Sequence, residues 1–259
     1  MYIYEIVQPG TWLDNENQHE KFEAESIVRS LISQFYEANL CLNLFLSSVQ
    51  SRSSGRSSQW NQDSIRKADI RREIESKLGR LDAEHWEDVN FEAELIFKRE
   101  QWSKGRLPRE FEHNTSFIYA RSFLYALDSF DKFTKVLKNN PISPESISDF
   151  YDEISVTFPD LRGVRNTSQH MEDRSRGLGA GRNPKPLDLK PINNNMVNSD
   201  NGALMLNCLN GTKYGNTMAD GHYGEVDVSP RSMEMLQSIL QRILDALSWT
   251  GAKSHYPNI

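Results

Sequence analysis

The sequence has few cysteines and no long hydrophobic run. Only two cysteines, Cys41 and Cys208, occur among 259 residues, which predicts neither a disulfide framework nor a zinc site built from cysteines. No apolar run approaches the roughly 20 residues that cross a bilayer. The first residues also lack the basic stretch and apolar stretch of a secretory signal. We therefore expect a cytoplasmic protein with no metal, no other cofactor and no membrane association.

An excess of positive charge is also missing. The chain has 30 Lys and Arg residues against 36 Asp and Glu, a net charge of −6. Proteins that coat themselves with nucleic acid are usually basic overall, so any nucleic-acid contact here must be local. One local basic cluster lies between residues 162 and 182 and consists of Arg162, Arg165, Arg174, Arg176 and Arg182.

The hydrophobic pattern predicts a mainly α-helical fold. Apolar residues recur every three or four positions, which predicts apolar helices over residues 22–49, 110–137, 144–156 and 231–249. Arg121 and Asp128 lie on the second of these, and the sequence assigns neither a role. Two charged helices are expected at 63–78 and 82–103, after a Ser-rich loop at 51–62. We expect an N-terminal arm, 1–21, and one helical domain, 22–259, into which 63–103 is inserted.

The segment before the last helix has a different pattern. Three short β-like runs, 203–209, 213–218 and 222–228, are separated by Asn210-Gly211 and Asp220-Gly221, which favour hairpin turns. This pattern predicts a small antiparallel meander over 203–228. A Pro- and Asn-rich loop precedes it, and Ser229-Pro230 is typical of the start of a helix.

The residues with the clearest chemical potential are Arg165-Asn166-x-x-x-His170, in a helix expected from 160 to 175. Histidine can move a proton near neutral pH, and arginine can hold a phosphate. The spacing alone is not specific, because Arg80 and His85 also satisfy it. That pair straddles an expected helix break and has no polar residue after the arginine, whereas Asn166 follows Arg165 directly.

With this motif the chain resembles the HEPN superfamily. These all-α, often dimeric domains occur in toxin–antitoxin modules, abortive-infection systems and RNA-cleaving effectors. Their signature is an arginine, a polar residue and a histidine four to six positions after the arginine. The resemblance covers roughly residues 22–50 and 110–250, so that the charged helices and the meander are insertions in a HEPN-like helical bundle. It implies metal-independent cleavage of RNA by a homodimer, with an antitoxin or defence-system component as a further expected partner.

The motif residues can be given chemical roles. His170 is expected to act as general acid or base, and Arg165 to stabilise charge on the phosphoryl oxygens. Asn166, on the same helix face as His170, would orient the imidazole or hold a phosphate oxygen. Arg165 and His170 are separated by about 140° around an ideal helix, so a two-fold dimer is expected to complete the site. The residues expected to bind the RNA backbone are Arg162, Arg174 and Arg176.

Two other interpretations stay open. One is a catalytically silent HEPN-like protein that works as a binding or regulatory subunit, and the other is a helical scaffold with no role on nucleic acid. The ribonuclease requires Arg165 and His170 to line a shared, accessible cleft. The silent protein would have them buried, paired to acidic groups or facing away from any interface, and the scaffold would have no positive patch around residues 162–182.

Overall fold

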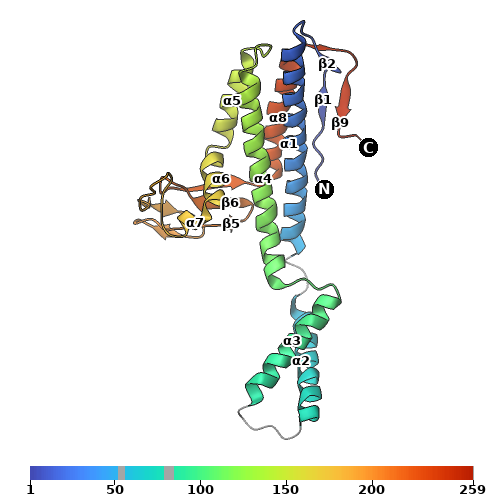
Figure 1. The fold of residues 1–259 in the computed structure, drawn as a ribbon, viewed down its shortest axis with the longest axis vertical. Helices are drawn as coiled ribbons and strands as arrows, with labels where there is room; N and C mark the ends of the chain where they lie inside the picture. The colour runs from blue at the N-terminus through green and yellow to red at the C-terminus, as the bar shows by residue number, and fades with distance from the viewer. Residues whose placement is uncertain (52–55, 79–84, 259) are drawn as a thin grey trace. The chain divides into compact units, whose positions relative to one another are not determined.

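A computed structural model describes residues 1–51, 56–78 and 85–258 (Figure 1). The fold is mainly α-helical, as predicted: the chain is 59 % helical, with eight helices and small antiparallel sheets in the described ranges. The chain divides into two compact units. The larger contains Met1–Phe45 and Phe117–Ile259, and the smaller contains Leu46–Ser116. None of the described helices combines the length and the apolar content that a membrane-spanning helix needs.

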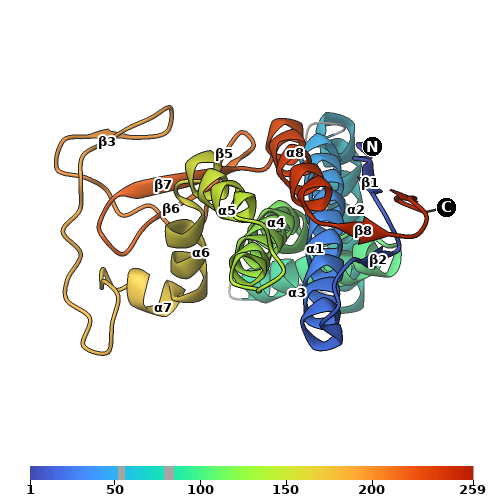
Figure 2. The same cartoon turned by 90° about the horizontal axis from the view of Figure 1, so that it is seen from above.

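The larger unit is built around long apolar helices that run alongside one another in both views (Figures 1 and 2). They are α1 (Gln18–Ser51), α4 (Arg109–Lys138), α5 (Ser146–Thr157) and α8 (Pro230–Ala246). Their apolar faces bury large side chains completely, among them Phe35, Phe123, Phe130 and Leu240. Burial of each such side chain contributes about 1.5–3 kcal/mol to stability. The predicted start of α8 is confirmed, because Ser229 caps the helix by accepting a hydrogen bond from the Ser232 backbone N–H at 3.3 Å.

The N-terminal arm pairs with a segment from the other end of the described chain. Strand β1 (Ile6–Gln8) pairs with β9 (Ser254–Tyr256), and β2 (Trp12–Leu13) pairs with β8 (Trp249–Thr250), both antiparallel. Two predicted boundaries are therefore wrong. The arm gives way to helix at Gln18, and the last helix ends at Ala246 because Trp249 belongs to a strand.

The predicted meander is confirmed as a three-stranded antiparallel sheet. Its order is β5 (Cys208–Asn210), β6 (Lys213–Thr217) and β7 (Tyr223–Asp227). Asn210 pairs with Lys213, so the central residues of the first turn are Gly211 and Thr212. Residues 203–207 are not a strand, which corrects the first β-like run. The preceding loop contains a short hairpin of β3 (Ile192–Asn193) and β4 (Asn198–Ser199).

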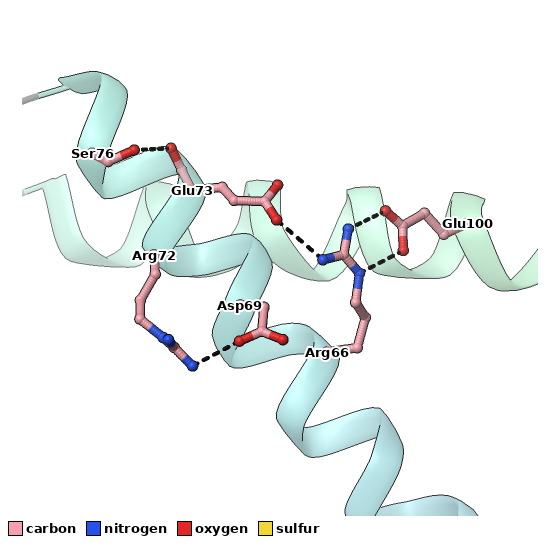
Figure 3. A network of polar contacts seen from close by, with 6 residues as sticks. All are labelled: Arg66, Asp69, Arg72, Glu73, Ser76 and Glu100. Atoms are coloured by element: carbon pink, nitrogen blue, oxygen red, sulfur yellow. Dashed lines mark hydrogen bonds and ion pairs between the residues drawn. The ribbon is translucent and has the colours of Figure 1, made fainter.

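The smaller unit contains the two charged helices, α2 (Arg56–Leu78) and α3 (Trp86–Ser103). Each contributes one apolar stripe to a small core of Ile70, Ile74, Val89, Ala93 and Phe97. Ion pairs join the helices beside this core. Figure 3 shows Arg66 between Glu73 and Glu100, 2.7 Å from the latter. The Ser-rich loop prediction is wrong from Arg56 onwards, where α2 has begun, while 52–55, 82–84 and Arg80 lie outside the described residues.

Acidification is expected to open the α2–α3 pair. Hydrogen bonds from Lys67 and Arg66 hold the pKa values of Glu94 and Glu100, respectively, below their usual range. The ionised carboxylates therefore stabilise the folded pair above the ordinary glutamate pKa, and this contribution is lost as the pH falls through the lowered folded values. Backbone amide hydrogen exchange in α2 and α3, corrected for its intrinsic pH dependence, should accelerate several-fold between pH 6 and pH 3.

Matched variants distinguish the contribution of the Glu94 and Glu100 carboxylates from other effects of low pH on exchange. A Glu94→Gln, Glu100→Gln double variant should lose most of the pH dependence of exchange, because it lacks both lowered pKa values. Glu92→Gln, which removes an exposed carboxylate of the same helix, should keep it. Equal pH dependence in all three proteins would contradict the assignment.

Candidate functional site

The predicted motif occupies a short helix and the break that follows it. Helix α6 (Leu161–Gln169) ends before His170, whose backbone angles of −122° and 43° leave the helical region, and α7 (Met171–Arg174) follows. The prediction of one helix from 160 to 175 is therefore wrong. The chain turns at His170 so that Arg174 enters the interior, where its side chain is 1 % exposed and its Nη1 donates to the carbonyls of Leu178 and Gly179, each at 2.6 Å.

The meander supports the motif helix from one side, as the neighbouring labels in Figure 2 show. Thr167 Oγ1 donates to the Thr217 carbonyl at 3.2 Å, and Asn216 Nδ2 donates to Ser168 Oγ at 3.0 Å. Gly163 permits this close approach, because a Cβ there would lie 2.2 Å from the sulfur of Met218. The predicted insertion 203–228 thus positions the motif.

Helix α4 holds the motif arginine from another side. Arg165 Nη2 lies 2.8 Å from Asp128 Oδ1, and Arg165 Nη1 donates to Gln169 Oε1 at 2.7 Å. The Arg165 side chain is 12 % exposed, and its Nε has no hydrogen-bond partner in the described part of the chain. The other oxygen of Asp128 pairs with Lys132 at 2.6 Å. One nearly buried carboxylate therefore serves two cations, which leaves a local excess of one positive charge.

His170 and Asn166 are placed differently from Arg165. The His170 side chain is 57 % exposed, and its Nδ1 lies 3.6 Å from Glu172 Oε1. The Asn166 side chain is half-buried and makes no hydrogen bond to the described residues, although its backbone carbonyl accepts from His170 N at 3.1 Å. Arg165 donates to Gln169, the residue directly before His170, so its side chain is directed toward the end of α6. His170 lies just past that end, outside the helix.

The arginines predicted to bind the RNA backbone fall into two groups. The prediction that Arg174 binds the RNA backbone is wrong, because this side chain is buried and donates to carbonyls of its own chain. Arg162 and Arg176 are exposed, but each is paired with an aspartate, Asp131 at 3.3 Å and Asp173 at 2.6 Å. Burial raises the pKa of Asp131 despite the neighbouring Arg162. Within the described residues the basic cluster is thus largely neutralised by acids.

Sequence reasoning missed Asp128 and Lys132 as parts of the site. Both lie on the helix that the hydrophobic pattern identified, four residues apart, a spacing that places them on one helix face. The sequence placed Asp128 on this helix but gave no local signal that singled it out from the other charged residues there. Its partner, Arg165, is distant in the sequence, so no local pattern connects them.

One group of side chains in the described ranges has the geometry of metal ligands. Ligand atoms of His170, Glu172 and Asp173 lie within 4.8 Å of one another. His170 and Glu172 are exposed, and Asp173 is already paired with Arg176. The group therefore has only two uncommitted side chains, and we assign it no cofactor.

Comparisons with protein-family models, with curated proteins and with solved structures find no match for this chain. The interpretation of the site therefore rests on its own residues and their geometry.

Proposed function

We propose that the chain is a HEPN-like endoribonuclease that cleaves RNA without a metal ion, at a site built from Arg165, Asn166 and His170. The observation that supports this best is the arrangement at the end of α6. There the guanidinium of Arg165 is fixed beside Gln169, and the imidazole of the next residue is open to solvent. A fixed cation and an accessible proton carrier are the two groups that phosphodiester cleavage needs.

The proposed reaction is attack by the RNA 2′-hydroxyl on the adjacent phosphorus. The new O–P bond forms as the bond to the 5′-oxygen breaks, and the products are a 2′,3′-cyclic phosphate and a 5′-hydroxyl. One group accepts the 2′ proton and another donates a proton to the 5′-oxygen. His170 supplies one of these steps, and His170 of a second copy in a homodimer supplies the other. Arg165 and Lys132 stabilise the added negative charge, and Asn166 donates to a phosphate oxygen.

A second candidate function is supported by the ion pair between Arg165 and Asp128. An arginine that is 12 % exposed and already paired with a carboxylate matches what is expected of a catalytically silent binding or regulatory subunit. The ribonuclease proposal needs a positive charge beyond the one that Asp128 neutralises, and Lys132 supplies it. It pairs with the other oxygen of Asp128, so the three charges together still attract a phosphate.

The decisive experiment is incubation of total RNA with the full chain in EDTA. We expect the wild type to cleave, and His170→Ala to reduce the rate by about 10²–10⁴-fold, the usual contribution of a general acid or base. His222→Ala is the matched control, because His222 is 59 % exposed and lies 3.2 Å from Asp220, and it should cleave at the wild-type rate.

Three outcomes decide between the candidates. Cleavage that survives His170→Ala would end the proposed mechanism. RNA that is bound but not cleaved by the wild type would favour the silent subunit. A strictly monomeric active protein in sedimentation experiments would exclude the shared dimeric site. Toxicity on expression that Arg165→Ala relieves would further support a toxin or defence effector.

A further inference from the structure

The polar face that carries Asp128 continues along α4. Arg121, Tyr125, Asp128 and Lys132 follow one another at intervals of three or four residues, so they share one side of the helix. Asp128 contacts Arg165 of α6, which shows that this side faces the candidate site. Arg121 lies seven residues before Asp128, about 10 Å along the helix axis.

Arg121 is a half-buried cation with no acidic partner among the described residues. Its one hydrogen bond in the described part of the chain is from Nη1 to Asn207 Oδ1, at the long distance of 3.5 Å. Arg162, Arg165 and Arg176, by contrast, are each paired with an aspartate. A partly desolvated guanidinium gains more from an anion than an exposed one does, because fewer water molecules compete for it. Its other four N–H donors have no acceptor in the ranges that the structure describes.

Asn207, beside Arg121, is held in an unusual conformation. Its φ of 52° makes it the one non-glycine residue with a positive φ in the described ranges. Its side-chain oxygen accepts from the hydroxyl of the fully buried Tyr214 at 3.0 Å, and its backbone N–H donates to Asn216 Oδ1 at 2.6 Å. These contacts fix the Asn207 amide, whose Nδ2 donates to no described residue. Such backbone conformations persist where the surroundings enforce them, often at functional sites.

The same contacts connect Asn207 to the motif helix. Asn216 donates to Ser168 Oγ at 3.0 Å, and Ser168 Oγ lies 3.2 Å from the Tyr214 hydroxyl. Arg121 and Asn207 are thus held on the same framework as Arg165, and both have N–H donors that no described residue accepts.

We propose that Arg121 and Asn207 form a second phosphate-binding position, which takes a phosphate of the RNA strand other than the scissile one. This inference rests on the proposed function and adds the substrate class: a single strand several nucleotides long, in preference to a dinucleotide. The contact is to a phosphate and therefore carries no base specificity.

The first test is RNA binding by the full chain with His170→Ala, measured with a fluorescent oligoribonucleotide of about 12 nucleotides. Adding Arg121→Gln should weaken binding about 10-fold, as expected for loss of a charged hydrogen bond. It should also reduce the slope of log K against log salt by about 0.7, the value for one phosphate contact on a single strand. Arg29→Gln is the control, since Arg29 is exposed on α1, and it should change neither quantity.

The second test compares substrate lengths in the active protein. Arg121→Gln should lower kcat/KM for the oligonucleotide about 10-fold and leave that for a dinucleoside monophosphate unchanged. Asn207→Gly keeps the positive φ and removes the side-chain amide. It should also lower kcat/KM for the oligonucleotide alone, by less than Arg121→Gln does. Inorganic phosphate at millimolar concentration should compete with the oligonucleotide less effectively in Arg121→Gln than in the wild type.

The outcomes separate this inference from the proposed function. If RNA is bound but never cleaved and Arg121→Gln still weakens binding, the second position stands and the ribonuclease fails. If Arg121→Gln affects long and short substrates equally, or neither, or if the chain binds no RNA, the inference is overturned. Thermal melting of each variant identifies losses that come from unfolding alone.

Discussion

Asp128→Ala is expected to lower the free energy of unfolding by about 3 kcal/mol, because it leaves the nearly buried Arg165 without its counter-ion. Urea denaturation measures the difference. Lys132→Ala is the natural comparison. It breaks the other ion pair of the same carboxylate, but Lys132 is 59 % exposed, so the cost should stay below about 1 kcal/mol.

A double-variant cycle tests whether the Arg165–Asp128 pair itself is responsible. Asp128→Ala combined with Arg165→Ala should be more stable than the sum of the single effects predicts, since the second substitution removes the uncompensated charge. Additive effects, or equal losses for Asp128→Ala and Lys132→Ala, would mean that the pair does not hold the site together. Asp128→Ala should also slow the RNA cleavage that we propose, because Arg165 is no longer fixed at the end of α6.

Gly221→Ala should destabilise the larger unit by more than about 3 kcal/mol, whereas Gly211→Ala should cost only about 1 kcal/mol. Both glycines lie in turns of the meander with positive φ, 88° and 64° respectively. They differ in their surroundings. A Cβ on Gly221 would lie 1.8 Å from the Asp188 carbonyl oxygen, and a Cβ on Gly211 would meet nothing within 4 Å. Comparing the two variants thus distinguishes the free-energy cost of the steric clash from the cost of the positive φ.

The effect of Gly221→Ala should extend to the motif helix. Because β6 supports α6 through Asn216 and Thr217, hydrogen exchange in α6 should accelerate in this variant and stay near the wild-type rate in Gly211→Ala. Equal melting temperatures for the two variants would contradict this prediction, because they would show that the loop containing Asp188 moves to accommodate the Cβ at little cost.

Local patterns in the sequence were sufficient for most helices and for the meander. Apolar residues at helical intervals placed α1, α4 and α5 to within a few residues, and Ser229-Pro230 identified the start of α8. Two glycine-containing turns indicated the meander. Each of these elements is determined mainly by residues close to it in the chain, which is why the sequence was informative.

The arrangement of the candidate site was not predictable from the sequence. Arg165, Asn166 and His170 remain the predicted site residues, but the break at His170 goes with the burial of Arg174 among carbonyls that no periodicity reveals. The pairing of Arg165 with Asp128 depends on how α6 packs against α4. The pairing of β1 with β9 joins segments near opposite ends of the chain, and short strands of two or three residues have no distinctive pattern.

The pairing of Ile6 with Tyr256 also affects the order in which the chain folds during its synthesis. Ribosomes add about 5–20 residues per second, so roughly 12 to 50 seconds pass between the synthesis of these two residues. During that interval α2 and α3, which follow one another closely in the chain, can close their small core. The helix with Arg165 must wait for β6, and the arm must wait longer still. The packing around Arg165 is therefore completed only after the small core of α2 and α3 can form, and the pairing of the arm comes later still.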